Sequence, residues 1–569
     1  MGNKRLHINY RLFCLGLIYL YFGSMSILAI EPVVERVYVQ IDKQVYLAGE
    51  NLWTKLYVTG LKGEISLFSK IAYLELIGDT IPYVQQKIDV KSGIADSRIH
   101  LPVDIPTGNY RLVAYTRAMR NEGETVFFSR PVTVYNPFTV ERIGYSQEEQ
   151  NLSSADNAIV PLTSSVITSN KSQYSTREQG QISIHGLDKD AYSLSLSIAK
   201  KENLPGMPPL TIDDWKANIP KEQYLKVASF LPEYEGHIVL GSIVSEDQSK
   251  ETFRRNIITP LIAFPGQGIR LFSGQIKENG EVLFFTKRID GTHDVVSSAL
   301  LFSEKLFRVD IQSPFATHSR TESLSAPVVS ATLQDELLER SIGVQAMQGF
   351  YGDTIWQTSY EAPHVVNTPE RVYKLDEYTR FTTMQEVITE FVLGLRFRKI
   401  NDKRFLSSLT EERDGFTSAN TLVLLDGVPL LDHESIYNYD PLLVESIELY
   451  RGKYLFGGQM FDGIAYFKTY DQDYKGVKLD PSSQLFTYRG TEPKSHFFMP
   501  DYSDPAKRAS RLPDMRHTLL WIPDIQTQGQ PIINIPFFTS DLKGEFIVTI
   551  EGLSKTGQTI RSSATFRVE

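Results

Sequence analysis

The chain carries histidines and carboxylates that could hold a metal ion, but their spacing argues against such a site. His433 lies directly between Asp432 and Glu434. Adjacent residues on one loop rarely converge on a single ion, so this cluster predicts a solvated turn. The segment 471–473 (Asp-Gln-Asp) and Gly476 have the opening spacing of a calcium loop, but the closing Glu is missing. We therefore predict a turn there, and no metal or other cofactor.

The sequence also lacks the motifs that would build a catalytic centre. Neither HExxH nor GxSxG occurs, and no GxxxxGK is followed by Ser or Thr; these patterns supply zinc ligands, an activated serine and a phosphate loop. We expect no catalytic residues and no enzymatic activity. The rings of Trp53, Tyr57, Tyr110 and Tyr115 could stack on a sugar, but their positions on alternating strands favour core packing.

Composition predicts a β-rich protein of several domains. The 569 residues are 41% hydrophobic, include 29 Tyr and 31 Phe, and carry a formal net charge of −9. Aromatic residues are enriched in strands. The negative charge argues against a nucleic-acid partner, because such partners are bound by basic surfaces.

Residues 1–29 have the pattern of a secretory signal peptide. Three basic residues precede an apolar run from Leu12 to Ile30, and Ala29 ends a small-residue cleavage site. An uncleaved membrane anchor is the alternative, because the run is close to bilayer-spanning length. No other run is as long and apolar, so we expect no transmembrane span after signal cleavage.

Residues 30–140 predict a first β-sandwich. The blocks VYVQIDKQVYLAGE and IPTGNYRLVAY alternate apolar and polar residues around turns, and both are similar to the second macroglobulin-like (MG2) domain of the α2-macroglobulin family. That family traps proteases through a thioester made from a cysteine. The only cysteine here, Cys14, lies in the predicted signal, so the resemblance implies the module without the covalent trap. The motif residues are Asp42, Lys43, Tyr46, Gly49, Gly108 and Tyr110.

Three further segments predict β-structure. Residues 158–232 repeat the alternating pattern and indicate a second macroglobulin-like or immunoglobulin-like sandwich. Residues 233–320 are similar to carboxypeptidase regulatory-like domains, which are non-catalytic β-sandwiches, on the segment GHIVLGSIV and the late Asn279-Gly280. The strands of 481–569 are expected to complete an earlier sandwich rather than form a domain of their own.

Residues 327–480 predict two helices and a small mixed sheet. One helix is expected over 333–347, and a second begins at Thr383, with a capping box and a one-sided apolar face that suits packing on the sheet. The blocks LVLLDGVPL, DPLLVESIELYRG and FGGQMFDGIAYFKT then follow in order, and together they resemble the plug domain of TonB-dependent outer-membrane receptors. The residues that carry this motif are Asp426, Gly427, Pro441, Gly457, Gly458 and Gly463.

Two plug-motif positions have local explanations. Asp426-Gly427 predicts a hairpin turn, and Pro441 after Asp440 predicts the start of a short helix. In the receptor family the plug sits inside a large barrel. The 99 residues after Tyr470 are fewer than the roughly 220 that 22 strands need, so we expect the plug fold without the barrel.

The sequence thus predicts a mainly β chain, with tandem macroglobulin/Ig-like sandwiches followed by a small α+β plug-like domain. The resemblances imply a Bacteroidetes-type, non-enzymatic envelope protein, periplasmic or associated with the outer membrane. Its edge strands and the loops around Gly427 and Gly458 would dock another outer-membrane or periplasmic protein. Two alternatives stay open: a ligand-binding accessory of TonB-dependent nutrient uptake, and a thioester-less protease-binding macroglobulin relative.

Overall fold

The computed structural model describes most of the chain in the mature region. The described residues are 33–143, 166–187, 192–221, 229–245, 258–266, 268–301, 307–318, 324–327, 333–351, 368–409, 420–456, 459–527 and 530–569. The predicted signal peptide lies outside them. Strands dominate, which confirms the predicted mainly β chain of sandwich domains. Among the helices that are described, none is both long and apolar enough to cross a membrane.

The first sandwich packs a three-stranded sheet, β1-β3-β6, on a five-stranded sheet, β2-β8-β7-β4-β5. Its core is rich in fully buried tyrosines, each of which needs a hydrogen-bond acceptor for its hydroxyl. Tyr115 donates to Glu75 at 2.6 Å, and Tyr38 donates to Glu551 of a neighbouring domain at 2.7 Å. The strands are β1 (Arg36–Ile41), β2 (Val45–Leu47), β3 (Asn51–Thr59), β4 (Ile71–Gly78), β5 (Ile81–Asp89), β6 (Ile94–His100), β7 (Gly108–Thr116) and β8 (Phe128–Tyr135).

The second sandwich combines strands from two distant parts of the sequence. Its sheets are β10-β32-β31-β12-β29 and β30-β11-β9, so β12 is paired on both sides by C-terminal strands. The strands are β9 (Ile167–Ser169), β10 (Gln173–Tyr174), β11 (Gln179–His185), β12 (Tyr192–Lys200), β29 (Thr518–Gln526), β30 (Ile532–Phe538), β31 (Gly544–Ser554) and β32 (Thr559–Val568).

A seven-stranded domain follows, with strand order β18-β13-β16-β15-β14-β17-β28. Residues from both ends of this sheet share one apolar core, so the sheet curls on itself. Residues 481–569 are therefore divided between two domains, because β28 pairs with β17 here. The strands are β13 (Ile238–Ser245), β14 (Ile258–Ala263), β15 (Leu271–Ile276), β16 (Glu281–Phe285), β17 (Thr292–Leu301), β18 (Phe307–Ile311) and β28 (Gln484–Arg489).

The domain that the sequence predicts to be plug-like, and which keeps that name here, is a mixed sheet, β19-β24-β27-β22-β23, covered by helix α4. The helix buries Met384, Val387 and Ile388 against the sheet, and Thr383 caps it by accepting the Glu386 N–H at 3.3 Å. The strands are β19 (Arg371–Lys374), β20 (Leu395–Ile400), β21 (Lys403–Ser408), β22 (Leu422–Leu425), β23 (Val428–Pro429), β24 (Val444–Tyr450), β25 (Tyr454–Phe456), β26 (Gln459–Phe461) and β27 (Ile464–Thr469).

The helix predicted over 333–347 spans Gln334–Tyr351 (α3). The sequence had suggested that it belongs to the plug-like domain, but it lies outside that domain. It packs Leu337 and Val344 on the first sandwich, beside Leu47. Its periodicity shows an apolar face but cannot show which sheet covers that face. The remaining α-helices are α2 (Ile212–Ala217), α4 (Met384–Glu390), α5 (Glu434–Tyr437) and α6 (Pro505–Arg508).

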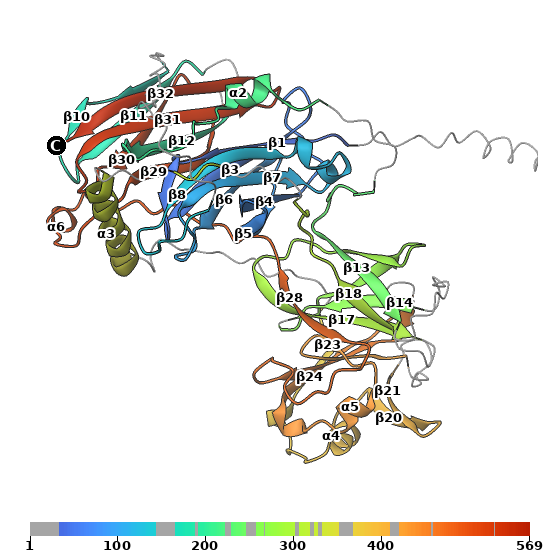
Figure 1. Cartoon of the computed structure of the whole chain (residues 1–569). Helices are drawn as coiled ribbons and strands as arrows, with labels where there is room; N and C mark the ends of the chain where they lie inside the picture. Colours follow the sequence, from blue (N-terminus) through green and yellow to red (C-terminus); the bar gives the residue numbers. More distant parts are fainter. Residues whose placement is uncertain are drawn as a thin grey trace, which may run out of the picture.

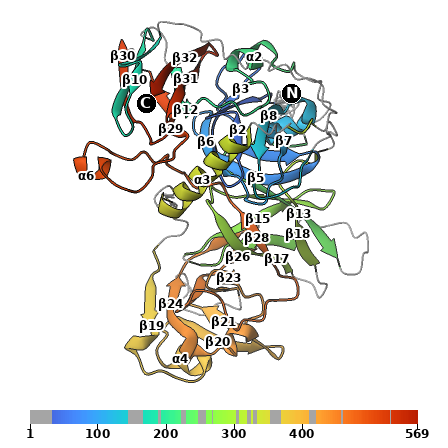
Figure 2. The same cartoon turned by 60° about the vertical axis from the view of Figure 1, so that its left-hand side comes forward.

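The molecule has two lobes (Figures 1 and 2). The two sandwiches lie side by side, with α3 beside them, and the seven-stranded and plug-like domains form a lobe below. The chain enters the lower lobe at β13, returns to the first sandwich after β18 to place α3 there, re-enters the lower lobe before β19 and leaves it finally after β28. The lower lobe is thus inserted between the two halves of the second sandwich in two passages of the chain, which α3 separates.

Candidate functional site

Asp426 is the hub of the plug-like motif. It is fully buried, with φ +47° at the turn between β22 and β23. Its carboxylate accepts hydrogen bonds from the Thr469 N–H at 2.8 Å, the Thr469 hydroxyl at 2.6 Å and the Tyr474 N–H at 2.9 Å. This side chain therefore ties the hairpin to the end of β27 and has no free oxygen edge for a partner.

Gly427 is covered by the seven-stranded domain, so its loop is not the docking surface that the sequence suggested. It has φ +86°, and an added Cβ would lie 3.2 Å from the Phe264 carbonyl oxygen. The Gly266 N–H donates to the Asp426 carbonyl at 2.9 Å, and the Tyr466 hydroxyl donates to the Gly266 carbonyl at 2.8 Å. The turn is therefore packed against another domain of the same chain.

The other plug-motif residues shape the domain locally. Asp440 accepts the Leu442 N–H at 2.9 Å, and Pro441 opens the short 3₁₀ helix η5 (Pro441–Leu443). Gly463 has φ +112°, and an added Cβ would lie 2.6 Å from the Ser408 hydroxyl. Gly457 and Gly458 lie outside the described residues.

The plug-like sheet ends in an edge strand. Within the part of the chain that the structure describes, β19 pairs only with β24. Tyr373 points into the core, whereas Arg371, Val372 and Lys374 are exposed. An edge strand presents backbone N–H and C=O groups that can pair with an added strand.

The macroglobulin-like motif lies where the two sandwiches meet. Asp42 accepts hydrogen bonds from the Tyr46 hydroxyl at 2.8 Å, the Trp53 N–H at 3.0 Å and the Thr518 hydroxyl of β29 at 2.7 Å. The motif therefore joins β29 of the second sandwich to the first. Gly108 and Tyr110 lie elsewhere, on β7, where Tyr110 donates to the Pro106 carbonyl.

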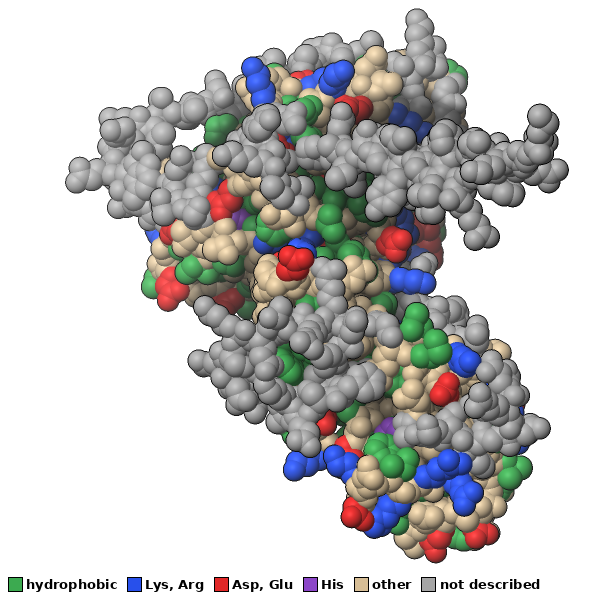
Figure 3. All heavy atoms as spheres, turned by 90° about the vertical axis from the view of Figure 1, so that its right-hand side faces the viewer, with side chains coloured by type: hydrophobic (Ala, Val, Ile, Leu, Met, Phe, Trp, Pro, Cys, Tyr) green, Lys and Arg blue, Asp and Glu red, His purple; other side chains and the backbone are tan. Residues whose placement is uncertain are grey.

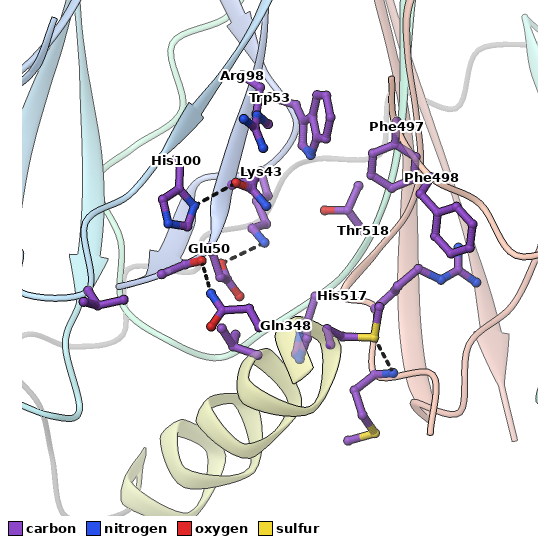
Figure 4. Close-up of a pocket in the computed structure, with 17 residues that line it drawn as sticks. Lys43, Glu50, Trp53, Arg98, His100, Gln348, Phe497, Phe498, His517 and Thr518 are labelled. Carbon is purple, nitrogen blue, oxygen red and sulfur yellow. Dashed lines mark hydrogen bonds and ion pairs between the residues drawn. The ribbon is translucent and has the colours of Figure 1, made fainter. Parts of the chain in front are cut away.

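A cleft of about 600 Å³ opens beside this motif, and no pattern in the sequence indicated it. Lys43 and Gly49 line it, together with α3 and a strap of chain, residues 490–517, which leads from β28 to β29 (Figure 4). The lining comes from segments hundreds of residues apart, so no local motif could have indicated it. The apolar lining residues are Trp53, Val103, Val344, Met347, Phe497, Phe498 and Met515.

A buried charge network lies beside the cleft, whose lining includes its members Lys43, Glu50 and His517. Arg340 of α3 donates to both oxygens of Glu50, at 3.1 and 2.8 Å, and also pairs with Glu202. Lys43 pairs with Glu50 at 2.9 Å, and His517 contacts Glu202 at 2.7 Å. Burial opposes ionisation of Glu50, but the charges of Arg340 and Lys43 outweigh it and hold the pKa of this carboxyl below its usual range.

The residues considered for metal binding do not form a site. No group of three or more potential metal ligands occurs among the described residues. His433 is buried rather than solvated, which corrects the sequence interpretation: its Nδ1 accepts the Leu406 N–H at 2.9 Å, and burial lowers its pKa to about 4. Asp473 pairs with Lys475 in an exposed turn.

Comparisons with known proteins give a distant structural likeness. No family model matches the sequence, and no curated protein matches it either. A structure of Escherichia coli alpha-2-macroglobulin activated by porcine elastase aligns with 94% of this chain and 44% of its own, at 7% identity and a TM-score of 0.24. Salmonella alpha-2-macroglobulin reacted with methylamine aligns with 94% and 40%, at 9% identity and 0.24.

An Escherichia coli adhesin, FdeC, aligns with 48% of this chain and 94% of its own, at 9% identity and a TM-score of 0.14. The chain spans less than half the length of the macroglobulins with which it aligns. At these TM-scores the fold rests on the strand order described above, and no activity is transferred from these proteins.

Proposed function

We propose that this chain is a non-enzymatic component of the cell envelope that docks another envelope protein through its plug-like domain, in the periplasm or at the outer membrane. The observation that carries the proposal is the edge strand β19, paired only with β24 among the described residues. The two-sandwich body supports the lower lobe, which holds the plug-like sheet outward (Figure 1).

The route is strand addition at β19, because the loop at Gly427, one of the two loops expected to dock, packs within the chain. The turn at Asp426-Gly427 is packed on the seven-stranded domain. Val372 is 48% exposed, and Leu442 and Leu443 of the same domain are exposed as well. On the face shown in Figure 3, basic and acidic side chains intermingle on the lower lobe. This surface suits a protein partner that carries both signs of charge better than a polyanion.

A capture experiment with matched proline variants tests this. We expect the tagged chain to retain the same partner reproducibly from solubilised outer membranes. Val372→Pro should lose that partner, because proline removes a backbone donor and blocks an added strand. Ile400→Pro, in the exposed β20–β21 hairpin of the same domain, should retain it.

Lys374→Glu provides a second test at the end of the same strand, without a proline. It should weaken capture while leaving the melting temperature unchanged. Equal capture by wild type and both β19 variants would overturn the proposed route, and the absence of any partner that depends on β19 would overturn the proposed function.

A further inference from the structure

The cleft between the sandwiches continues into a second hollow. A hollow of about 350 Å³ adjoins the larger cleft and shares Trp53 and Phe497 with it. These two rings meet edge to face, with centroids 5.4 Å apart. Figure 4 shows Trp53 and Phe497 facing each other across the top of the larger cleft. Both volumes fall in or near the range of about 300–1,000 Å³ that is usual for small-ligand sites.

The larger hollow has more basic than acidic side chains in its lining. Lys43, Arg98 and Arg516 line it, and Glu50 is the one acidic lining residue among those that the structure describes. Lys43 is paired with Glu50 at 2.9 Å, and Arg516 is paired with Asp514 at 2.7 Å. Both oxygens of Glu50 already accept hydrogen bonds from Arg340. Burial lowers the pKa of Arg98 to about 10, opposed by Glu492.

The smaller hollow has a different chemistry. Its polar lining includes Asp96, Ser97 and Trp521, the basic side chains of Lys494 and His496, and Asp524, which is paired with Lys55 at 3.2 Å. Trp521 is 2% exposed, and its Nε1–H has no hydrogen-bond partner within the described part of the chain. Carboxylates accept hydrogen bonds from hydroxyl groups, and the indole N–H is a buried donor without an acceptor. This hollow thus suits a group that is rich in hydroxyls.

We propose that the paired hollows bind a short acidic saccharide. A sugar carboxylate lies against Arg98 and Lys43 in the larger hollow, and sugar rings stack on Trp53, Phe497 and Phe498. Hydroxyls of an adjoining ring meet Asp96, and a ring oxygen accepts from Trp521. A purely aromatic acid would leave the polar groups of the smaller hollow unused, and a neutral sugar would leave the cations of the larger one unused.

Calorimetric titration of the purified chain with trigalacturonate tests this. We expect binding that Arg98→Gln weakens about tenfold or more through loss of a charge-assisted contact. Phe497→Ala should weaken it as well, by removing the ring shared by both hollows. Lys507→Gln, a charge-matched change on α6 outside both hollows, should leave the affinity unchanged.

Two further ligands separate charge from ring recognition. The methyl ester of trigalacturonate keeps the rings without the charge, and citrate keeps the charge without the rings; each should bind at least tenfold more weakly. Equal binding of either one overturns the proposal, as does the absence of binding or an affinity that neither variant changes. If Arg98→Gln lowers the melting temperature, its weaker binding could come from misfolding, and the test then depends on Phe497→Ala and the methyl ester. The outcome is independent of capture at β19.

Discussion

At the scale of single residues, Asp426 shows how a turn residue acquires a structural role beyond its turn. The sequence predicted the hairpin, because Asp-Gly suits a left-handed turn. It could not predict that the same carboxylate accepts three hydrogen bonds from residues 43 to 48 positions later. Such contacts depend on β27 lying beside β22, which only the folded sheet determines.

Removing this carboxylate should loosen the plug-like sheet. We predict that Asp426→Ala lowers the local free energy of unfolding by about 2–4 kcal/mol, because it leaves buried donors without an acceptor. Hydrogen exchange of peptides covering β22 and β27 measures the change. Asp440→Ala, which removes an exposed cap, should cost only about 1 kcal/mol. Similar protection in both variants would contradict the assignment of Asp426 as the hub.

At the scale of elements, α3 acts as a clamp between the sandwiches. Arg340 is 1% exposed and joins Glu50 of the first sandwich to Glu202, which follows β12 of the second. The Gln348 side chain donates to the Gly49 carbonyl at 2.7 Å on the same side. The sequence showed the apolar stripe of this helix, but a lone arginine on a helix does not reveal two carboxylates far away in the chain.

Breaking this clamp should destabilise the upper body. We predict that Arg340→Ala lowers the free energy of unfolding by about 3–5 kcal/mol, because two buried carboxylates lose their shared counter-charge. The loss for Arg340→Lys should lie between those of wild type and Arg340→Ala, since lysine keeps the charge but loses the bidentate contact with Glu50. Thermal unfolding and the rate of proteolysis within α3 measure the effect.

The control for the clamp is an exposed ion pair nearby. Lys201 pairs with Glu545 at 3.3 Å, and both side chains are about half exposed. Lys201→Ala should therefore change the free energy of unfolding by less than about 1 kcal/mol. A loss for Arg340→Ala as small as this would show that α3 is held by its apolar face alone.

At the scale of the whole molecule, local patterns predicted where strands occur but not which strands pair. The alternation in β12 and β31 is visible in the sequence, whereas their pairing joins Tyr192 to Ser554 across the inserted lobe. The expectation placed all of 481–569 in one sandwich, yet β28 completes the seven-stranded sheet. The cleft was missed for the same reason, because its walls meet only after these long-range pairings form.

The junction between the lobes contains a buried titratable cluster. Glu233 accepts from the Tyr73 hydroxyl at 3.1 Å and from the Ile238 N–H at 2.8 Å, which links the first sandwich to the start of β13. Lys87 of β5 lies 3.2 Å from His237 Nδ1, which in turn contacts the Tyr488 hydroxyl of β28 at 2.7 Å. The cluster therefore joins the first sandwich to β13 and β28, where the chain first enters and last leaves the lower lobe.

Two shifted pKa values in this cluster predict how stability depends on pH. Burial raises the pKa of Glu233 to about 7, opposed by Arg117, the Tyr73 hydroxyl, the Ile238 N–H and Lys87. The contribution of Glu233 to the free energy of unfolding is complete below about pH 4.5 and is lost as pH rises through 7. Burial lowers the pKa of Lys87 to about 7, so its penalty is present below pH 7 and is relieved toward pH 10.5.

The two groups together predict that the junction is least stable near pH 7. Glu233→Gln should remove the fall between about pH 4.5 and 7, which amounts to about 3 kcal/mol, because glutamine cannot ionise. Glu235→Gln, an exposed position two residues away, should keep the wild-type profile. Denaturation from pH 4 to 10, with proteolysis at the β13 and β28 crossings as the local probe, measures both curves. A Glu233→Gln curve that still falls in that window would show that the junction is not controlled by this carboxyl.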